Sequence, residues 1–208
     1  MNKIFEEVLM NFKFMNDLYS DSYNLLMENN RRIVAEHSRE VAIECKMLAK
    51  RFRINTDDAE TAGFLHDISA IYPNGKRLEI ANILGIEVLE EEKKFPLILH
   101  QKISQVMVRE IWNIKDELVL NAIGCHTTLR DNPSQLDLVL FVADKIKWDQ
   151  KGIPPYINEL QEGLNISLEH GAYGYIKYLM DNKSNLKVVH PWLKDAYDYL
   201  RFKLNILD

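Results

Sequence analysis

Apolar residues recur at helical spacing along nearly the whole chain, whereas strict alternation of apolar and polar residues, which is typical of a half-buried strand, is almost absent. Glycine and proline are scarce, with 8 and 6 residues, and they stand where the helical stretches end. An amphipathic helix must bury its apolar stripe against a neighbour. The pattern therefore predicts an all-α helical bundle of about eight elements.

Local signals predict where these helices begin and end. Helices are expected over residues 2–18, 31–52, 55–66, 96 onward, 116–126 and 134 onward, with two or three more after Pro154 and Pro155. The polar residues 20–22 suggest a break and a new N-cap, and residues 72–75 form a dense turn signal. Ser134 and Asp137 have the spacing of a capping box. The acidic run at residues 90–94 is interpreted as a solvated helix face.

Composition bounds the class of protein. The 208 residues suit one domain, placed at residues 31–205, with a helical extension at residues 1–30. A net charge of −5 argues against binding a nucleic-acid polymer but not against a nucleotide substrate, because a metal ion can supply positive charge locally. Cys45 and Cys125 lie in apolar helical patterns and are expected to be reduced. No signal peptide or membrane span is apparent, so a cytoplasmic protein without membrane contact is expected.

Six residues with metal-binding chemistry stand at positions that periodicity predicts to be buried or half-buried. They are His37, His66, Asp67, His100, His126 and Asp144. One histidine on an apolar helix face is more often a satisfied core residue, but imidazoles and carboxylates gathered from several helices suit zinc, iron or manganese. Successive residues on a helix diverge by about 100°. His66 and Asp67 can therefore share one ion only near a helix end, or serve two ions with Asp67 as the bridge.

Short strings surround these residues: Glu36-His37-Ser38, Ala62-Gly63-Phe64-Leu65-His66-Asp67-Ile68, Leu99-His100, Asn121-Ala122-Ile123-Gly124-Cys125-His126-Thr127-Thr128 and Leu138-Val139-Leu140-Phe141-Val142-Ala143-Asp144-Lys145-Ile146. Their order and content resemble the HD superfamily of phosphohydrolases. The resemblance is strongest to the YqeK-type symmetrical bis(5'-nucleosyl)-tetraphosphatases and spans roughly residues 31–200. It implies an HD-domain helical bundle around a metal site.

The resemblance also implies roles for individual residues. The implied metal ligands are His37, His66, Asp67 and Asp144, with His100 and His126 near a second ion or the phosphates. The implied metal is iron, as one or two ions. Catalytic roles are expected for Asp67, His100 and His126, and substrate contacts for His100, His126, Thr127, Arg130 and Lys145. The implied reaction is cleavage of diadenosine tetraphosphate to two ADP, and a homodimer is left open.

Several positions depart from the family pattern. Val34 replaces a basic residue, Ala70 a lysine, and Gln101 and Leu129 each a glycine, while residues 147–150 replace a Glu-Pro with a nearby arginine. Fewer cations should weaken polyphosphate binding.

Two alternatives therefore stay open. One is hydrolysis of a mononucleotide or another phosphoester. The other is a metal-bound sensor or binding protein with little turnover, using the extra N-terminal helix and the aromatic tail. That tail comprises Tyr173, Tyr175, Tyr178, Trp192, Tyr197 and Tyr199, and core packing is the favoured interpretation of it.

Overall fold

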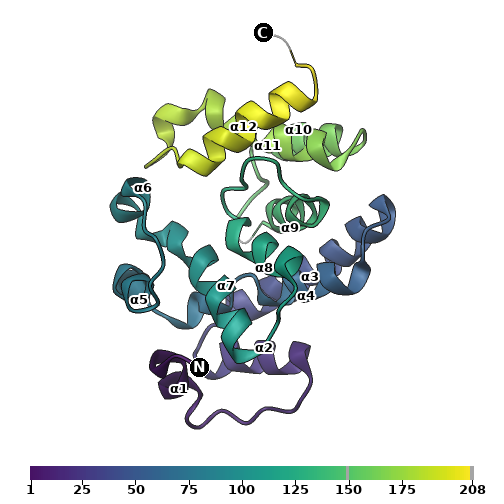
Figure 1. Ribbon diagram of the computed structural model, residues 1–208. Coiled ribbons are helices and arrows are strands. Elements are labelled where there is room, and N and C mark those ends of the chain that lie inside the picture. The colour runs from purple at the N-terminus through teal and green to yellow at the C-terminus, as the bar shows by residue number, and fades with distance from the viewer. Residues whose placement is uncertain (149, 207–208) are drawn as a thin grey trace.

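The structure is a computed structural model that describes residues 1–148 and 150–206. Within these residues the chain consists of α-helices, short 3-10 segments and turns, without a strand, which confirms the all-α class (Figure 1). The helices are α1 (Lys3–Leu9), α2 (Leu18–Glu28), α3 (Arg32–Phe52), α4 (Thr56–Leu65), α5 (Arg77–Ile83), α6 (Glu90–Lys94), α7 (His100–Ile111), α8 (Glu117–Cys125), α9 (Gln135–Ile146), α10 (Ile157–Leu164), α11 (Leu168–Asp181) and α12 (Pro191–Lys203). Three helices follow the two prolines, as expected.

Helices α4 and α9 begin directly after residues whose side chains cap them. The Ser134 hydroxyl accepts a hydrogen bond from the Asp137 backbone at 3.1 Å, and the Asp137 carboxylate accepts one from the Ser134 backbone at 2.9 Å. This confirms the capping box that begins α9. Asn55 caps α4 in a similar way, because its side-chain oxygen accepts from the Asp57 backbone at 3.0 Å.

The N-terminal prediction is wrong in its boundaries. Instead of one helix over 2–18, α1 ends at Leu9 and α2 begins at Leu18. Asp17 caps α2 by accepting from the Ser20 backbone at 2.9 Å, so the break predicted at residues 20–22 lies inside that helix. The buried Asp21 carboxylate instead accepts from the Met15 backbone at 2.7 Å and holds the preceding loop. Aspartate often marks a helix start, but Asp21 lies within the helix and its side chain binds the irregular segment before it.

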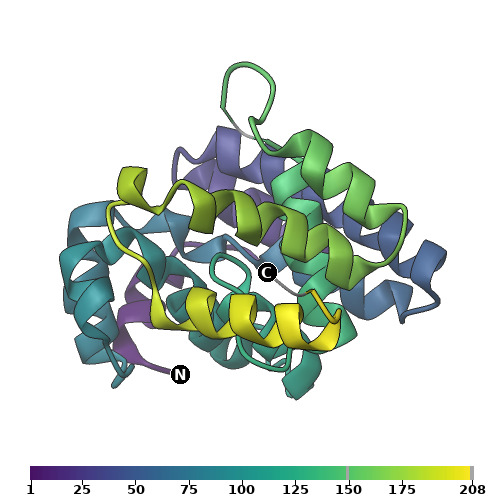
Figure 2. The same cartoon turned by 90° about the horizontal axis from the view of Figure 1, so that it is seen from above.

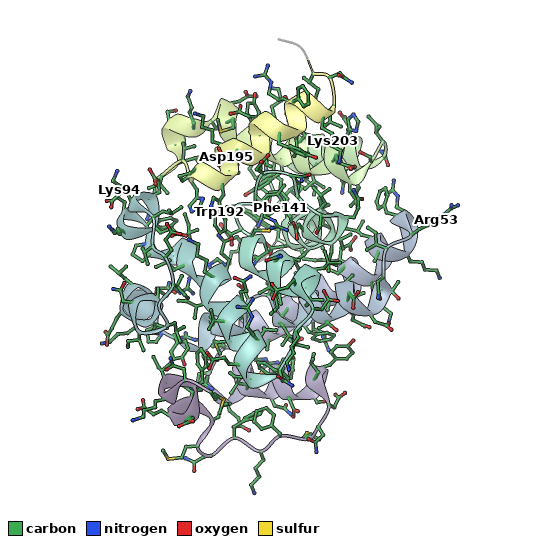
Figure 3. All side chains as sticks on the ribbon, in the orientation of Figure 1. Arg53, Lys94, Phe141, Trp192, Asp195 and Lys203 are labelled. Carbon is green, nitrogen blue, oxygen red and sulfur yellow. The ribbon has the colours of Figure 1, made fainter. Side chains whose placement is uncertain are left out.

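The centre of the fold is formed by α3, α4, α8 and α9, which pack on one another. Gly63 of α4 permits the closest approach, because a Cβ built there would lie 2.5 Å from the Ala42 Cα of α3. Figure 1 places α10, α11 and α12 over one end of the molecule and α1 and α2 at the other, and Figure 2 shows α11 and α12 from above. Phe141 of α9 is fully buried between the centre and the C-terminal helices, whereas Arg53 and Lys94 point outward (Figure 3).

The first 30 residues share the main core. Phe5, Leu25 and Leu26 are fully or almost fully buried and belong to the same hydrophobic cluster as the central helices. Cys45 and Cys125 are buried free thiols, as expected. Within the described residues, no helix combines the length and the hydropathy needed to cross a bilayer.

The interpretation of residues 90–94 as a solvated face fails for Glu92, which is fully buried. Its carboxylate accepts from the Lys102 ammonium of α7 at 2.8 Å and lies 3.3 Å from the His190 ring that caps α12. Lys102 also lies 4.7 Å from the centre of the Trp192 ring. A buried carboxylate persists where a cation and hydrogen-bond donors surround it, and here they come from helices distant in sequence.

Candidate metal and phosphate site

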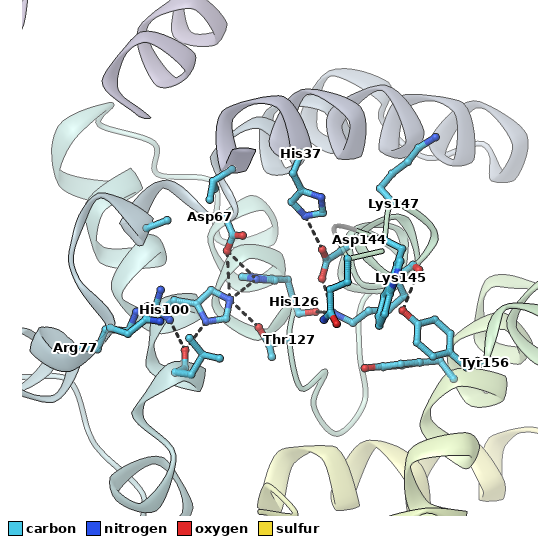
Figure 4. A pocket seen from close by; sticks show the side chains of 17 residues that line it. His37, Asp67, Arg77, His100, His126, Thr127, Asp144, Lys145, Lys147 and Tyr156 are labelled. Atoms are coloured by element: carbon cyan, nitrogen blue, oxygen red, sulfur yellow. Dashed lines mark hydrogen bonds and ion pairs between the residues drawn. The ribbon is translucent and has the colours of Figure 1, made fainter. Parts of the chain in front are cut away.

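The six residues of the metal-binding pattern come together from five helices or helix ends. His37 lies in the first half of α3, His66 and Asp67 follow α4, His100 begins α7, His126 follows α8, and Asp144 lies near the end of α9. Figure 4 shows most of them around one pocket, with their polar atoms pointing to a common centre. The apolar stripes that bury each helix therefore bring these side chains to one place.

Backbone carbonyls fix the orientation of three imidazole rings. The Nδ1 atoms of His66, His100 and His126 lie 2.7, 2.6 and 2.8 Å from the carbonyl oxygens of Gly63, Leu97 and Ile123, respectively, each three residues earlier. A carbonyl only accepts, so each Nδ1 carries the proton and donates it. Each Nε2 of a neutral ring then presents a lone pair, which is the arrangement of a histidine that binds a metal.

Asp67 lies between two groups of ligand atoms. Its Oδ1 is 3.3 Å from the His100 Nε2 and 3.5 Å from the His126 Nε2, and its Oδ2 is 3.7 Å from the His66 Nε2. Asp144 extends the second group, because its Oδ1 lies 3.1 Å from the His37 Nε2 and 3.7 Å from the His66 Nε2. Two sets can thus hold an ion, His37 with His66 and Asp67, and Asp67 with His100 and His126.

A cation fits this arrangement. The His66 Nε2 is buried and has no hydrogen-bond partner. The Nε2 atoms of His100 and His126 lie only 2.9 Å apart, and with both Nδ1 atoms protonated two neutral rings would oppose their lone pairs. A divalent ion would give the His66 Nε2 a partner and would accept the opposed lone pairs of His100 and His126. Mixed imidazole and carboxylate donors suit iron, manganese and zinc. The residues present therefore fit a divalent metal ion.

The protonation states agree with this use. Burial lowers the pKa of His66 to about 4 and that of His100 to about 3, so both rings are neutral near pH 7. Burial alone would raise the pKa values of Asp67 and Asp144. The surrounding histidines, together with Lys145 beside Asp144, outweigh burial and hold both pKa values well below the usual range.

Five of the six residues, all but the fully buried His66, line a pocket of about 450 Å³. Its remaining lining combines cationic, aromatic, aliphatic and uncharged polar side chains: Val34, Ala70, Asn74, Arg77, Leu97, Thr127, Lys145, Lys147, Trp148, Gln150, Tyr156 and Tyr175. Thr127 and Lys145, expected to contact substrate, both line it, and the Thr127 hydroxyl lies 3.0 Å from the His100 Nε2. Arg130 does not line it, because its guanidinium binds the buried Asp137 carboxylate at 2.8 Å.

The departures from the family pattern have distinct structural settings. Val34 and Ala70 line the pocket. Gln101 is buried, and its side chain accepts from the Thr127 backbone at 3.0 Å, so it holds the segment after α8. Leu129 is fully buried at φ 58°, a conformation that favours glycine, so its packing must offset backbone strain. Asp149 lies outside the described residues.

Sequence reasoning missed Arg77 and the three aromatic residues of the pocket as site residues. Arg77 begins α5, a helix that was not predicted although Ile80, Ala81 and Leu84 follow it at helical spacing. The aromatic rings form one group: the Tyr156 ring centre lies 5.7 Å from that of Trp148 and 4.5 Å from that of Tyr175. Of the tail aromatics, Tyr173 is buried and Tyr175 is half-buried at the pocket.

Comparisons with known proteins agree with this geometry. The HD domain family model matches residues 34–149. An uncharacterised protein in the pepC 5' region of Lactococcus lactis subsp. cremoris is 45% identical over 73% of this chain and 77% of its own length. A symmetrical bis(5'-nucleosyl)-tetraphosphatase of Staphylococcus aureus is 33% identical over 53% of this chain and 57% of its own length. A crystal structure from Clostridium acetobutylicum, described as a predicted HD superfamily hydrolase involved in NAD metabolism, has a TM-score of 0.77 and 28% identity over 89% of this chain and 97% of that one.

Proposed function

This chain belongs to the HD domain family as a divergent YqeK-like, metal-dependent phosphohydrolase, and from that premise we propose that it hydrolyses a nucleotide polyphosphate, with diadenosine tetraphosphate cleaved to two ADP. One observation carries the proposal. The pocket that is lined by five of the six ligand residues is also lined by three cationic side chains, Arg77, Lys145 and Lys147, and by an aromatic group. Polyphosphate chains and nucleobases need these two kinds of contact.

We propose two ions, the first held by His37, His66, Asp67 and Asp144 and the second by His100 and His126, with Asp67 shared. Iron is the metal that the family resemblance implies. A bound divalent ion supplies Lewis-acid chemistry, lowering the pKa of water and polarising a phosphoryl oxygen. Three features support this assignment: the mixed donor set, the unpartnered His66 Nε2, and the close approach of the His100 and His126 Nε2 atoms.

The chain's own residues orient and neutralise the substrate. His100 and His126, fixed by their carbonyl partners, would keep their Nε2 atoms directed at the second ion. The Thr127 hydroxyl can donate to a phosphate oxygen, and Lys145 and Lys147 add positive charge to the same wall. Half-buried Trp148 and Tyr175 offer ring faces on which a base can stack.

A second candidate is a mononucleotide substrate, and one observation favours it. All three aromatic residues belong to a single group, which provides a stacking surface for one base and not for two. In cleavage of a symmetrical substrate, the second nucleoside would then lie outside the described contacts.

The decisive experiment is a substrate panel with product identification. Purified protein loaded with iron, manganese or zinc is incubated with diadenosine tetraphosphate, ATP, ADP, AMP and p-nitrophenyl phosphate, and products are separated by ion-exchange chromatography. We expect ADP alone from diadenosine tetraphosphate and the highest kcat/KM for that substrate. Release of AMP or inorganic phosphate as the main product, or a preference for a mononucleotide, would contradict symmetrical cleavage. Elemental analysis of the protein as purified tests iron as the resident metal.

A further inference from the structure

Arg77 is a buried cation without a carboxylate partner. Its side chain lines the pocket, yet the residue is only 6% exposed. One terminal nitrogen donates to the Leu97 carbonyl at 2.6 Å, and the buried Nε has no hydrogen-bond partner. None of the ion pairs among residues 1–148 and 150–206 includes Arg77. A charged guanidinium removed from water is costly unless an anion accompanies it.

The other two cations of the pocket differ from Arg77 in this respect. Lys145 contacts the Asp144 carboxylate, and Lys147 lies 3.0 Å from a carboxylate oxygen of Glu44. Burial lowers the pKa of Arg77 most, the Asp67 carboxylate raises it without forming an ion pair, and the positive charge of Arg31 lowers it further. Asp67 therefore offsets only part of the cost of burying this charge, and an anion in the pocket would offset more of it.

Leu97 ties Arg77 to the metal-binding histidines. The Leu97 carbonyl accepts from Arg77 and also from the His100 Nδ1, at 2.6 Å in each case. Figure 4 shows the Arg77 side chain beside His100, on the opposite side of the ligand cluster from Tyr156. A polyphosphate with its base at the aromatic group would thus pass the cluster and extend toward Arg77.

We propose that Arg77 binds a phosphate of the substrate directly and supplies the cation of the pocket wall where Val34 and Ala70 are apolar. The proposal rests on the proposed function only in taking a polyphosphate as the ligand. It also offsets the weak polyphosphate binding expected from the sequence, because a guanidinium offers a planar set of donors for phosphate oxygens.

The test uses inorganic tripolyphosphate, whose binding does not depend on which nucleotide is the substrate. Calorimetry on the metal-loaded protein compares the native chain with Arg77→Met, Arg77→Lys and the double variant Ala70→Lys/Arg77→Met. The control is Arg109→Met, because Arg109 is exposed and pairs with Glu117 at 3.3 Å. Loss of one charge-assisted phosphate contact should weaken binding roughly 10- to 100-fold in Arg77→Met. The control should stay within about twofold, and the double variant should recover part of the loss because Ala70 lines the same pocket.

Two results would overturn the proposal. The first is native-like tripolyphosphate binding by Arg77→Met. The second is a loss of metal or of kcat without a change in tripolyphosphate affinity and without recovery in the double variant, which would make Arg77 only a positioning residue for His100 through Leu97. If Arg77→Met fails to fold, Arg77→Gln decides, because it keeps amide donors without the charge, and unchanged tripolyphosphate affinity there contradicts the proposal. Arg77→Lys, which keeps the charge, should retain more affinity than either.

The panel of nucleotides separates this proposal from the proposed function. A native chain that hydrolyses no nucleotide but binds tripolyphosphate through Arg77 disproves the substrate and supports the Arg77 contact. A native chain that cleaves diadenosine tetraphosphate, with no loss of tripolyphosphate affinity in Arg77→Met, supports the substrate and disproves the Arg77 contact.

Discussion

At the scale of single residues, hydrogen bonds to the backbone prepare the site before any ligand arrives. His66, His100 and His126 each donate a proton from Nδ1 to a carbonyl one helical turn earlier, so the tautomer and the ring plane are set by local geometry. Asp67 then serves both groups of nitrogen atoms from its two oxygens. Preorganised ligands of this kind avoid reorganisation when the ion and the phosphate bind.

The shared position of Asp67 makes it the most sensitive residue of the site. We expect Asp67→Ala to lower phosphohydrolase activity by at least about 100-fold and to lower metal content, because both proposed ions lose a ligand. Adding metal should raise the melting temperature of the native chain but not that of Asp67→Ala. Asp57→Ala is the matched control, since Asp57 is an exposed carboxylate in the first turn of α4. Near-native activity of Asp67→Ala would place the site elsewhere.

At the scale of helices, the distance between α3 and α4 decides whether His37 and His66 can serve one ion. Gly63 allows the backbones to touch, and a Cβ there would lie 2.5 Å from the Ala42 Cα. The atom in the way belongs to the backbone, which cannot rotate aside as a side chain would. The crossing therefore depends on the absence of a single methyl group.

Gly63→Ala should be destabilising and should also impair metal binding. We expect a loss of about 1–3 kcal/mol in the free energy of unfolding, because the helices must separate. Urea denaturation measures the stability, and elemental analysis measures the metal. Gly75→Ala is the control, because a Cβ there meets nothing within 4 Å and should change stability by less than about 0.5 kcal/mol. Equal effects of the two substitutions would disprove the tight crossing.

The start of α9 provides a second test at this scale, since this helix carries Asp144 and Lys145. Ser134→Ala removes the hydroxyl that accepts from the Asp137 backbone at 3.1 Å. We expect a cost of about 1 kcal/mol in the free energy of unfolding, with kcat changed little because the cap lies at the opposite end of the helix. Ser134→Thr retains a hydroxyl and should recover most of the loss, and denaturant titrations of the three proteins check this.

At the scale of the whole molecule, a buried polar network joins helices that are far apart in sequence. Glu92 of α6, Lys102 of α7 and His190 at the start of α12 contact one another through the Glu92 carboxylate. The C-terminal helices also pack on α9 through α11. The C-terminal helices are thereby fixed to the helices that hold the site.

Removing one charged member of the Glu92–Lys102 pair should lower the free energy of unfolding more than removing both. Glu92→Leu leaves the Lys102 ammonium buried without its carboxylate, and we expect a loss of roughly 3–5 kcal/mol in the free energy of unfolding. Adding Lys102→Met to that variant should restore part of the stability, because both charges are then absent. A double variant as unstable as the sum of the two single variants would show that the pair is not coupled.

The same carboxylate should make stability depend on pH. Although burial alone would raise the pKa of Glu92, hydrogen bonds from His190, Leu89 and Lys102 hold it below the usual value. The stabilisation is therefore present above the unfolded pKa of about 4.3 and is lost as the pH falls through the lower folded value. Urea denaturation at pH 7 and in this acidic window should show a smaller loss for Glu92→Gln than for the native chain. Glu79→Gln, at an exposed pair with Lys76, should follow the native chain.

The sequence by itself determined the helical class and the set of histidines and aspartates that the fold brings together. Periodicity follows from the 3.6-residue turn, so it marks buried positions without knowledge of neighbours, and a histidine or aspartate at such a position stands out. Capping is also local, which is why the start of α9 was predicted correctly. The break between α1 and α2 was not, because Asp21 contacts a loop outside its own helix.

Only the tertiary structure decided how the histidines and aspartates divide into two ligand groups. It also decided which of the two arginines compared below forms an ion pair. His37 and Asp144 meet across 107 residues, and nothing local states that Asp67 faces both histidine groups. Arg130 and Arg77 are equally basic in the sequence, yet the first is neutralised by Asp137 and the second opens into the pocket without an ion pair among the described residues. Charge is a property of a residue, whereas an available charge depends on every helix packed around it.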